Sequence, residues 1–141
     1  MPMLKLTFYG YPDNDPPNSD AIAHPTPGRE RAGGVGTYED PVTTASLKVD
    51  EGGWLRPGQR LYAPSLKKYL IIEDDCADCV ADQIDVWISG VGHDKDTVEA
   101  CEARWTPNDP IEVELDPPPG REVVVDAFFK DGTGECRDPN A

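Results

Sequence analysis

The sequence has no long hydrophobic run and few basic side chains. No stretch of about 18 apolar residues occurs, so the sequence predicts no membrane span. The 141 residues include 13 Lys and Arg against 27 Asp and Glu, a formal net charge of −14 at pH 7. A surface of this charge repels phosphate groups, which argues against sequence-independent nucleic-acid binding. We therefore expect neither nucleic acid nor a membrane interior as a partner.

Residues that favour long helices are also scarce. The 15 Pro and 13 Gly argue against a helix bundle or coiled coil. The 3 Trp, 5 Tyr and 3 Phe require burial and argue against a disordered chain. We expect one folded, mainly β domain over residues 1–141, with a long Pro- and Gly-rich loop at 10–41 and a C-terminal tail at 131–141.

Alternation of apolar and polar residues, bounded by Pro and Gly turns, predicts short strands and one helix. A helix is predicted over 94–103, with Asp96 and Thr97 as its cap. About seven short strands with one helix are typical of a small closed barrel. The predicted strands are residues 3–9, 42–49, 59–63, 67–73, 83–89, and a closing hairpin of 111–115 with 122–129.

The sequence contains four cysteines, Cys76, Cys79, Cys101 and Cys136. An even number in a small, loop-rich chain favours two disulfides, and we expect Cys76 or Cys79 to bond to Cys101 across the base of the helix. Free thiols, a zinc site and a redox pair at the C-x-x-C spacing stay open as alternatives. We expect no metal and no cofactor.

Disulfides imply a secreted, extracellular protein. Residues 1–5 do not form a signal peptide. We therefore expect either that the leader is absent from this sequence or that the protein leaves the cell by a route that uses none.

An acidic cluster over residues 73–86 is the strongest candidate for chemistry. It holds six carboxylates and no basic residue. Like charges at close range raise each other's pKa, which is one way to keep a carboxylic acid protonated for general acid catalysis. Asp85 lies between Ile84 and Val86 in a predicted strand, where Asp is disfavoured. A solvated acidic edge, a calcium site and a set of turn caps are the structural alternatives.

Four segments, in this order over residues 3–89, resemble motifs of double-psi β-barrel proteins. Relatives of this superfamily include rare lipoprotein A, the 3D domains, the barwin-like endoglucanases, the expansins and loosenins, and the Streptomyces papain inhibitor. The resemblance implies a six-stranded double-psi β-barrel with one short helix. The matching segments are Thr7-Phe8-Tyr9-Gly10, Thr43-Thr44-Ala45-Ser46, residues 55–62, and residues 68–75 followed by Ile84-Asp85-Val86.

The resemblance also implies site residues. Asp85 matches the aspartate that is the general acid in the endoglucanases, and Asp75 matches a preceding aspartate of the superfamily. Glu39 or Asp40 corresponds to the second carboxylate, and Gln83 stands where the superfamily usually has Arg. We expect the substrate-binding residues to be Tyr9, Thr37, Tyr38, Asp74 and Trp87.

Aromatic rings could form a platform for sugars, because flat rings match the apolar faces of pyranosides. We expect Trp87 to be the most exposed of them, on the same face of its strand as Asp85. Packing in the core is the alternative for most of these rings, which are Tyr9, Tyr11, Tyr38, Trp54, Trp87 and Trp105.

These observations support a secreted, acidic, monomeric protein that binds, loosens or cleaves cell-wall polysaccharide through Asp85. If it is an enzyme, it resembles a lytic transglycosylase or a glycoside hydrolase. Two alternatives need no catalytic carboxylate: an inhibitor of a papain-like cysteine protease that uses the 10–41 loop, and a secreted effector or toxin. Fold alone does not choose among them.

Overall fold

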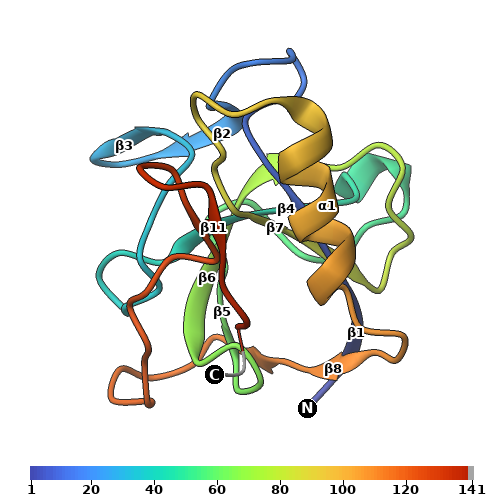
Figure 1. Ribbon diagram of the computed structural model, residues 1–141. Coiled ribbons are helices and arrows are strands. Elements are labelled where there is room, and N and C mark those ends of the chain that lie inside the picture. Colours follow the sequence, from blue (N-terminus) through green and yellow to red (C-terminus); the bar gives the residue numbers. More distant parts are fainter. Residues whose placement is uncertain (140–141) are drawn as a thin grey trace.

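The structure, a computed structural model, describes residues 1–139 (Figure 1). Its main element is a seven-stranded sheet with the strand order β8-β1-β7-β4-β6-β5-β9. β1 runs parallel to β7, β4 runs parallel to β6, and β4 is antiparallel to β7. The strands are β1 (Met3–Tyr9), β4 (Val42–Ser46), β5 (Arg60–Ala63), β6 (Lys68–Asp75), β7 (Gln83–Trp87), β8 (Ile111–Glu112) and β9 (Glu114–Leu115).

One short segment joins the two edges of this sheet. Ile111 pairs with Leu4 at the β1 edge, and Leu115 pairs with Leu61 at the β5 edge. Only Val113, which is fully buried, separates β8 from β9. The sheet is therefore a nearly closed barrel. The prediction of a mainly β barrel with one short helix is confirmed, with seven strands in place of six.

The alternation of the strands builds the core. In β1, Leu4 and Leu6 point inward and are at most 2% exposed, while Lys5 between them is exposed. The side chains of β6 are buried at nearly every position. The two edges of this strand pair with β4 and β5. The predicted strands 59–63 and 67–73 pair as expected, with Leu61 opposite Leu70.

The segment 10–41, expected as one long loop, contains a hairpin. β2 (Ala21–Thr26) pairs with β3 (Arg29–Arg31) around the turn at Pro27 and Gly28. Gly28 has a φ of +83°, a conformation that favours glycine at such a turn. The density of Pro and Gly suggested a loop, but a two-residue turn between short β segments forms a hairpin.

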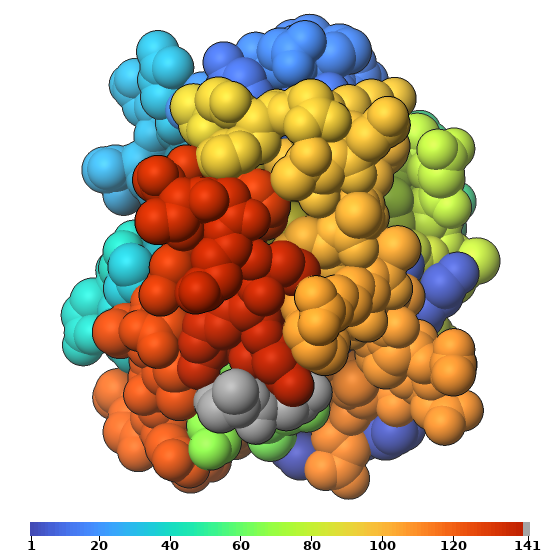
Figure 2. Space-filling view, viewed as in Figure 1, coloured from blue at the N-terminus to red at the C-terminus, as the bar shows by residue number. Residues whose placement is uncertain are grey.

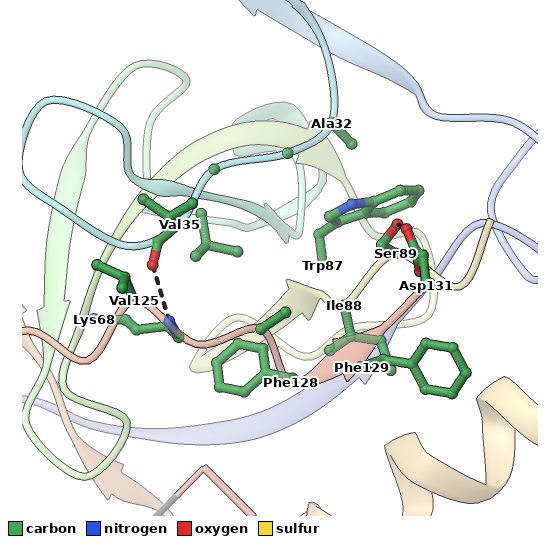
Figure 3. A pocket seen from close by; sticks show the side chains of 14 residues that line it. Ala32, Val35, Lys68, Trp87, Ile88, Ser89, Val125, Phe128, Phe129 and Asp131 are labelled. Atoms are coloured by element: carbon green, nitrogen blue, oxygen red, sulfur yellow. Dashed lines mark hydrogen bonds between the residues drawn. The ribbon is translucent and has the colours of Figure 1, made fainter. Parts of the chain in front are cut away.

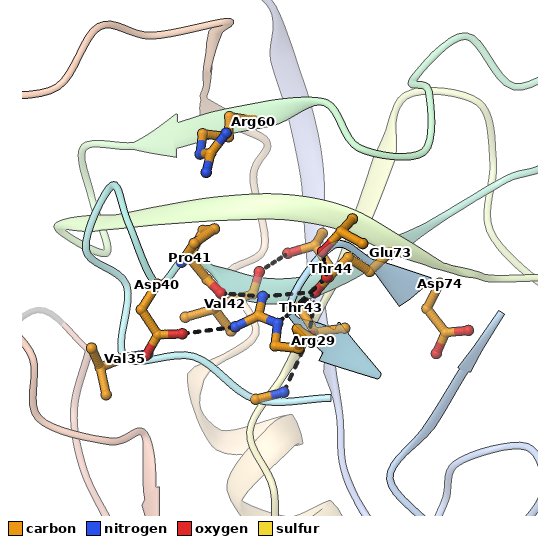
Figure 4. Close-up of polar contacts among 12 residues, drawn as sticks. Arg29, Val35, Asp40, Pro41, Val42, Thr43, Thr44, Arg60, Glu73 and Asp74 are labelled. Atoms are coloured by element: carbon orange, nitrogen blue, oxygen red, sulfur yellow. Dashed lines mark hydrogen bonds and ion pairs between the residues drawn. The ribbon is translucent and has the colours of Figure 1, made fainter. Parts of the chain in front are cut away.

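A buried ion pair fixes this hairpin to the barrel (Figure 4). The Arg29 guanidinium contacts the Glu73 carboxylate at 2.7 Å and the Asp40 carboxylate at 2.9 Å. Glu73 is fully buried and also accepts hydrogen bonds from the hydroxyls of Thr26, at 2.6 Å, and Thr43, at 2.9 Å. Because all these groups are paired, the buried charge of Glu73 is compensated.

The helix α1 (Lys95–Trp105) covers one side of β1. Its cap is Asp94, whose side chain accepts a hydrogen bond from the Thr97 backbone N–H, so the predicted cap at Asp96 and Thr97 is wrong by two residues. Val98 packs into the core beside Gly90, where a Cβ would lie 2.5 Å from a Val98 methyl group. A single-turn 3-10 helix, η1 (Val49–Glu51), lies between β4 and β5.

The predicted strand 122–129 does not form. Residues 121–127 have no regular secondary structure, and Phe129 and Lys130 instead begin a small hairpin, β10 (Phe129–Lys130) with β11 (Glu135–Cys136). Residues 111–115, the expected partner of this strand in a hairpin, pair instead with β1 and β5. The predicted tail 131–141 thus includes a strand, and its last two residues lie outside the described part of the chain.

Two disulfides are present, as predicted, but their pairing is different. Cys76 bonds to Cys79 and Cys101 bonds to Cys136, so the expected bond from Cys76 or Cys79 to Cys101 is wrong. The first pair closes a turn in which the Cys79 N–H donates to the Cys76 carbonyl. The second joins α1 to β11, which lie side by side in Figure 2, where the C-terminal segment is red and the helix is yellow to orange.

Over residues 1–139, no helix has the length and apolar character needed to cross a membrane.

Candidate functional site

Asp85 lies in β7 directly opposite Thr7 of the parallel strand β1. The Thr7 hydroxyl donates a hydrogen bond to the Asp85 carboxylate at 2.9 Å. The Gln83 side-chain amide donates in turn to the Thr7 oxygen at 3.0 Å. Gln83 thus orients the hydroxyl that holds Asp85.

The environment keeps the Asp85 carboxyl protonated over an unusual pH range. Burial raises the pKa of Asp85 to about 7, against the Thr7 hydrogen bond, which lowers it, and the charges of Asp13 and Asp74 raise it further. The clustered carboxylates of the sequence predicted this direction, whereas burial is its largest cause. A carboxylic acid that still holds its proton near neutral pH can donate it.

A second carboxyl with a raised pKa lies on α1. Burial raises the pKa of Glu102 to about 10, and the adjacent Asp13 and the charge of Asp85 act in the same direction. Glu102 is 8% exposed, and its Oε2 atom has no hydrogen-bond partner among the described residues. Asp13 itself accepts a hydrogen bond from the Gly10 backbone N–H at 2.9 Å. Asp13, Asp85 and Glu102 therefore form a group of mutually repelling carboxyls at the end of β1, and the protonated acids relieve the repulsion.

Asp74 completes this group from β6. Its carboxylate accepts hydrogen bonds from the Tyr9 hydroxyl at 2.8 Å and the Ala23 backbone N–H at 3.1 Å, and burial raises its pKa. Tyr9 is itself buried, and its ring meets Trp87 edge to face at 5.3 Å. Tyr9, expected to touch substrate, holds Asp74 in place.

Trp87 is not exposed as expected, because only 4% of it is accessible. The Tyr9 ring packs against it, and residues 32–35 and 125–129 lie beside it, so its side of β7 is not open to solvent. Of the aromatic rings proposed as a sugar platform, Trp54 is the most exposed tryptophan, at 38%, and its indole N–H donates to Asp82.

Asp75 follows Asp74 at the end of β6 and is partly exposed. It contacts the His24 ring at 2.7 Å, and the Lys48 ammonium is 4.0 Å away. Asp74 and Asp75 line a cavity of about 350 Å³ together with Lys48. Asp85 is half-buried and is not among the residues that line it.

The predicted residues 37–40 belong to a different part of the surface. Glu39 is exposed and lines a cavity of about 160 Å³ with Arg29 and Asp40. The Thr37 hydroxyl accepts a hydrogen bond from the Asp40 N–H at 3.0 Å, and the Tyr38 ring packs edge to face on Tyr69. These residues stabilise the loop around Arg29 (Figure 4), and none of them is among the groups that act on the Asp85 carboxyl.

Three potential metal ligands do converge at Asp85. Its carboxylate and the sulfur atoms of Cys76 and Cys79 all lie within 4.8 Å of one another. Both sulfurs are consumed by a disulfide, so they offer no thiolate to an ion.

The chain matches one family, described as DDB_G0273701 N-terminal domain, over residues 1–137. The chain belongs to this family. A relative from Dictyostelium discoideum, "Uncharacterized protein DDB_G0273701/DDB_G0273221", is 34% identical over 139 residues, which cover 94% of this chain and 58% of that protein. The chain thus spans less than two thirds of the length of this relative. No solved structure matches the chain.

In this member of the DDB_G0273701 N-terminal domain family, three residues around Asp85 were not predicted from the sequence: its partner Thr7 and two carboxyls of the acidic group, Asp13 and Glu102. Thr7 was quoted in a motif but was given no role. Glu102 shares the buried face of α1 with Val98 and Cys101, so an acidic residue at a helical core position was the available signal. Asp13 lies in an irregular segment, and nothing in its sequence context separates it from other loop aspartates.

Proposed function

We propose that this domain is a secreted double-psi β-barrel protein that acts on cell-wall polysaccharide, with Asp85 as its general acid. The observation that carries the proposal is a carboxyl with a pKa of about 7, bound by the Thr7 hydroxyl and close enough to Asp74 to be affected by its charge. A general acid must hold its proton at the working pH and release it to the leaving oxygen.

The topology supports the superfamily assignment. The parallel pairs β1–β7 and β4–β6, joined by the antiparallel pair β4–β7, bring the resembling motifs together in one barrel. Thr7 and Asp85, which come from the first and last of these motifs, become partners across one ladder. The two disulfides support export to an oxidising compartment.

Asp74 is the second carboxyl of the proposed site, in place of Glu39. Hydrogen bonds from Tyr9 and Ala23 hold its carboxylate, so it can stabilise positive charge that develops on a sugar ring. Asp85 then protonates the glycosidic oxygen as the bond to the anomeric carbon breaks, and water or a hydroxyl of the same sugar adds to that carbon and releases a proton. This assignment uses two carboxyls that the fold brings together, whereas Glu39 lines a separate cavity.

The test is the purified protein on insoluble cell-wall glycans, with bound protein, released oligosaccharide and wall extension measured together. We expect Asp85→Asn to retain the fold and lose cleavage or loosening. The matched control is Asp96→Asn, which removes an exposed carboxylate in the first turn of α1. Wild-type protein with neither glycan binding nor activity would overturn the proposal, and so would full activity in Asp85→Asn.

One observation favours a second candidate, inhibition of a papain-like protease. The β2–β3 hairpin and the loop after it are held rigidly by the Arg29–Glu73 ion pair, and a rigid, exposed segment loses little entropy on binding a partner. Papain inhibition that Val35→Arg abolishes and Asp85→Asn leaves unchanged would favour this candidate. Val35, in the 33–38 loop, is 43% exposed.

A further inference from the structure

Another cavity, of about 230 Å³, is lined by none of the carboxyls of the acidic group (Figure 3). Three segments distant in sequence form its walls: residues 32–35 after β3, residues 87–89 at the end of β7, and residues 125–131. Aromatic rings from Trp87, Phe128 and Phe129 line it, as Figure 3 shows.

The cavity contains a buried cation. Lys68 is 2% exposed, and its ammonium donates hydrogen bonds to the backbone carbonyls of Val35 at 2.9 Å and Val124 at 2.6 Å. No carboxylate of residues 1–139 forms an ion pair with it, although the charges of Asp126 and Arg137, which pair with each other, both act on it. An ammonium group has three N–H donors. Two bind the carbonyls, and the Nζ atom lies 5.2 Å from the centroid of the Phe128 ring, a weaker contact that a carboxylate ligand can replace. Burial lowers the pKa of Lys68 to about 8, which leaves it mostly charged at neutral pH.

The cavity also contains one acidic residue, and its oxygens are already bound. The Asp131 carboxylate accepts hydrogen bonds from the Ser89 hydroxyl at 2.6 Å and the Gly90 N–H at 2.7 Å. In Figure 3 it lies at the opposite side of the cavity from Lys68. Asp131 therefore fastens the C-terminal segment to the end of β7 and does not neutralise the ammonium.

The rim of the cavity is apolar. Val35 and Val125 line it and are 43% and 55% exposed, which places both among the few large hydrophobic side chains left open to solvent. In a chain with a net charge of −14, a cation without a carboxylate partner beneath an apolar rim is an unusual combination. It is complementary to a ligand with one anionic group and an apolar body.

We propose that this cavity binds a small organic carboxylate, with the carboxylate on the Lys68 ammonium and the apolar body against Trp87 and Phe128. The proposal does not depend on the proposed action on polysaccharide. Phosphate groups are usually held by several donors, such as Arg forks or a helix N-terminus, whereas one ammonium suits a carboxylate better. The cavity is smaller than the roughly 300–1,000 Å³ of sites for drug-sized ligands, so a short-chain acid such as hexanoate matches its size.

The test is a titration of the ¹⁵N-labelled, disulfide-bonded protein with sodium hexanoate and, as a neutral match, with hexan-1-ol. We expect hexanoate to shift the signals of Val35, Phe128 and the Trp87 indole. We also expect it to bind at least about ten-fold more tightly than hexan-1-ol, because only the acid forms a charge-assisted hydrogen bond with Lys68. Equal affinity for the two compounds, or shifts confined to other residues, would overturn the proposal.

Two variants separate the site from the fold. Lys68→Met removes the ammonium, but it also leaves the carbonyls of Val35 and Val124 without a donor. Ala127→Trp avoids this problem, because Ala127 is exposed and lines the cavity, so the new ring blocks the site without disturbing the core. We expect Ala127→Trp to keep the wild-type melting temperature and lose hexanoate binding, while Ala103→Trp on the exposed face of α1 keeps both. Unchanged hexanoate binding in Ala127→Trp would refute the assignment of the cavity.

Discussion

The Thr7 hydroxyl donates a hydrogen bond to the Asp85 carboxylate at 2.9 Å, between two residues that face each other across the β1–β7 ladder. The two residues are 78 positions apart in the sequence, so only the closure of the barrel brings them together. The parallel register fixes both backbones, and Gln83 fixes the hydroxyl. The position of the proposed general acid is thus set by regular secondary structure and not by a loop.

Thr7→Val should raise the pKa of Asp85 above its value of about 7. The Thr7 hydrogen bond lowers this pKa, whereas burial and the charges of Asp13 and Asp74 raise it. Val has the shape and strand preference of Thr, so β1 should still form. The ¹³C chemical shift of the Asp85 carboxyl carbon, followed against pH, measures the change. A lower or unchanged pKa would show that the Thr7 hydroxyl does not stabilise the ionised form.

Glu102→Gln should reduce the dependence of stability on pH. The folded-state pKa of Glu102 is about 10 and that of Asp85 is about 7, both above the unfolded values. Their contribution to stability is therefore complete below about pH 4 and is lost as the pH rises toward the folded-state values, by up to about 1.4 kcal/mol per pH unit for each group. Wild-type protein should be less stable at pH 7 than at pH 5.

Urea denaturation at pH 5 and pH 7 measures this difference. We expect Glu102→Gln to lose part of it, because Asp85 and Asp74, whose pKa values are also raised, still contribute in the variant. Asp96→Asn is the control, because Asp96 is an exposed carboxylate on the same helix. An equal loss of the difference in this control would contradict the role given to Glu102.

The two disulfides should differ in their effect on stability. Cys101–Cys136 closes a loop with a sequence separation of 35, against 3 for Cys76–Cys79. In the chain-entropy treatment, loss of the longer loop costs roughly 4 kcal/mol and loss of the shorter one roughly 2 kcal/mol. Thermal unfolding of Cys101→Ser/Cys136→Ser and of Cys76→Ser/Cys79→Ser compares the two. A larger loss of melting temperature in the second variant would contradict this ranking.

Breaking the buried ion pair should strongly destabilise the protein. Glu73→Gln removes the charge that compensates Arg29, and the loss of one partner of a buried pair costs about 3–5 kcal/mol. The exposed pair of Lys130 and Glu135 offers a control, because Glu135→Gln should cost less than about 1 kcal/mol. Equal changes in the free energy of unfolding would show that the pair does not hold the β2–β3 hairpin.

Local patterns predicted most of the barrel. Alternation identified β1 and β7, and Pro–Gly turns placed β5 next to β6, because these features depend on neighbouring residues. The hairpin β2–β3 was missed because its stability comes from Arg29 and Glu73, which are 44 positions apart. The strand at 122–129 was wrong because its expected partner, residues 111–115, pairs with β1 and β5, and no local signal reports such distant pairings.

The candidate site was predicted only in part, because most of its contacts join segments that are distant in sequence. Asp85 was found because an aspartate inside a strand is unusual, and its raised pKa follows from that burial. Trp87 was expected to be exposed because an alternating strand normally has one solvated face, but residues 32–35 and 125–129, which are distant in sequence, lie beside it and it is buried. The partners of Asp85, namely Thr7, Asp13 and Glu102, come from three other segments, and only the tertiary fold brings them together.

The pH dependence of glycan cleavage by wild-type protein and Asp85→Asn tests the central claim most directly. If Asp85 is the general acid, the wild-type rate should fall as the pH rises, with a midpoint near the Asp85 pKa of about 7. Asp85→Asn should lose at least about 10²-fold of the rate at pH 5 and show no such midpoint, with its melting temperature within a few degrees of wild type. A variant that cleaves at the wild-type rate with the same midpoint would contradict the account.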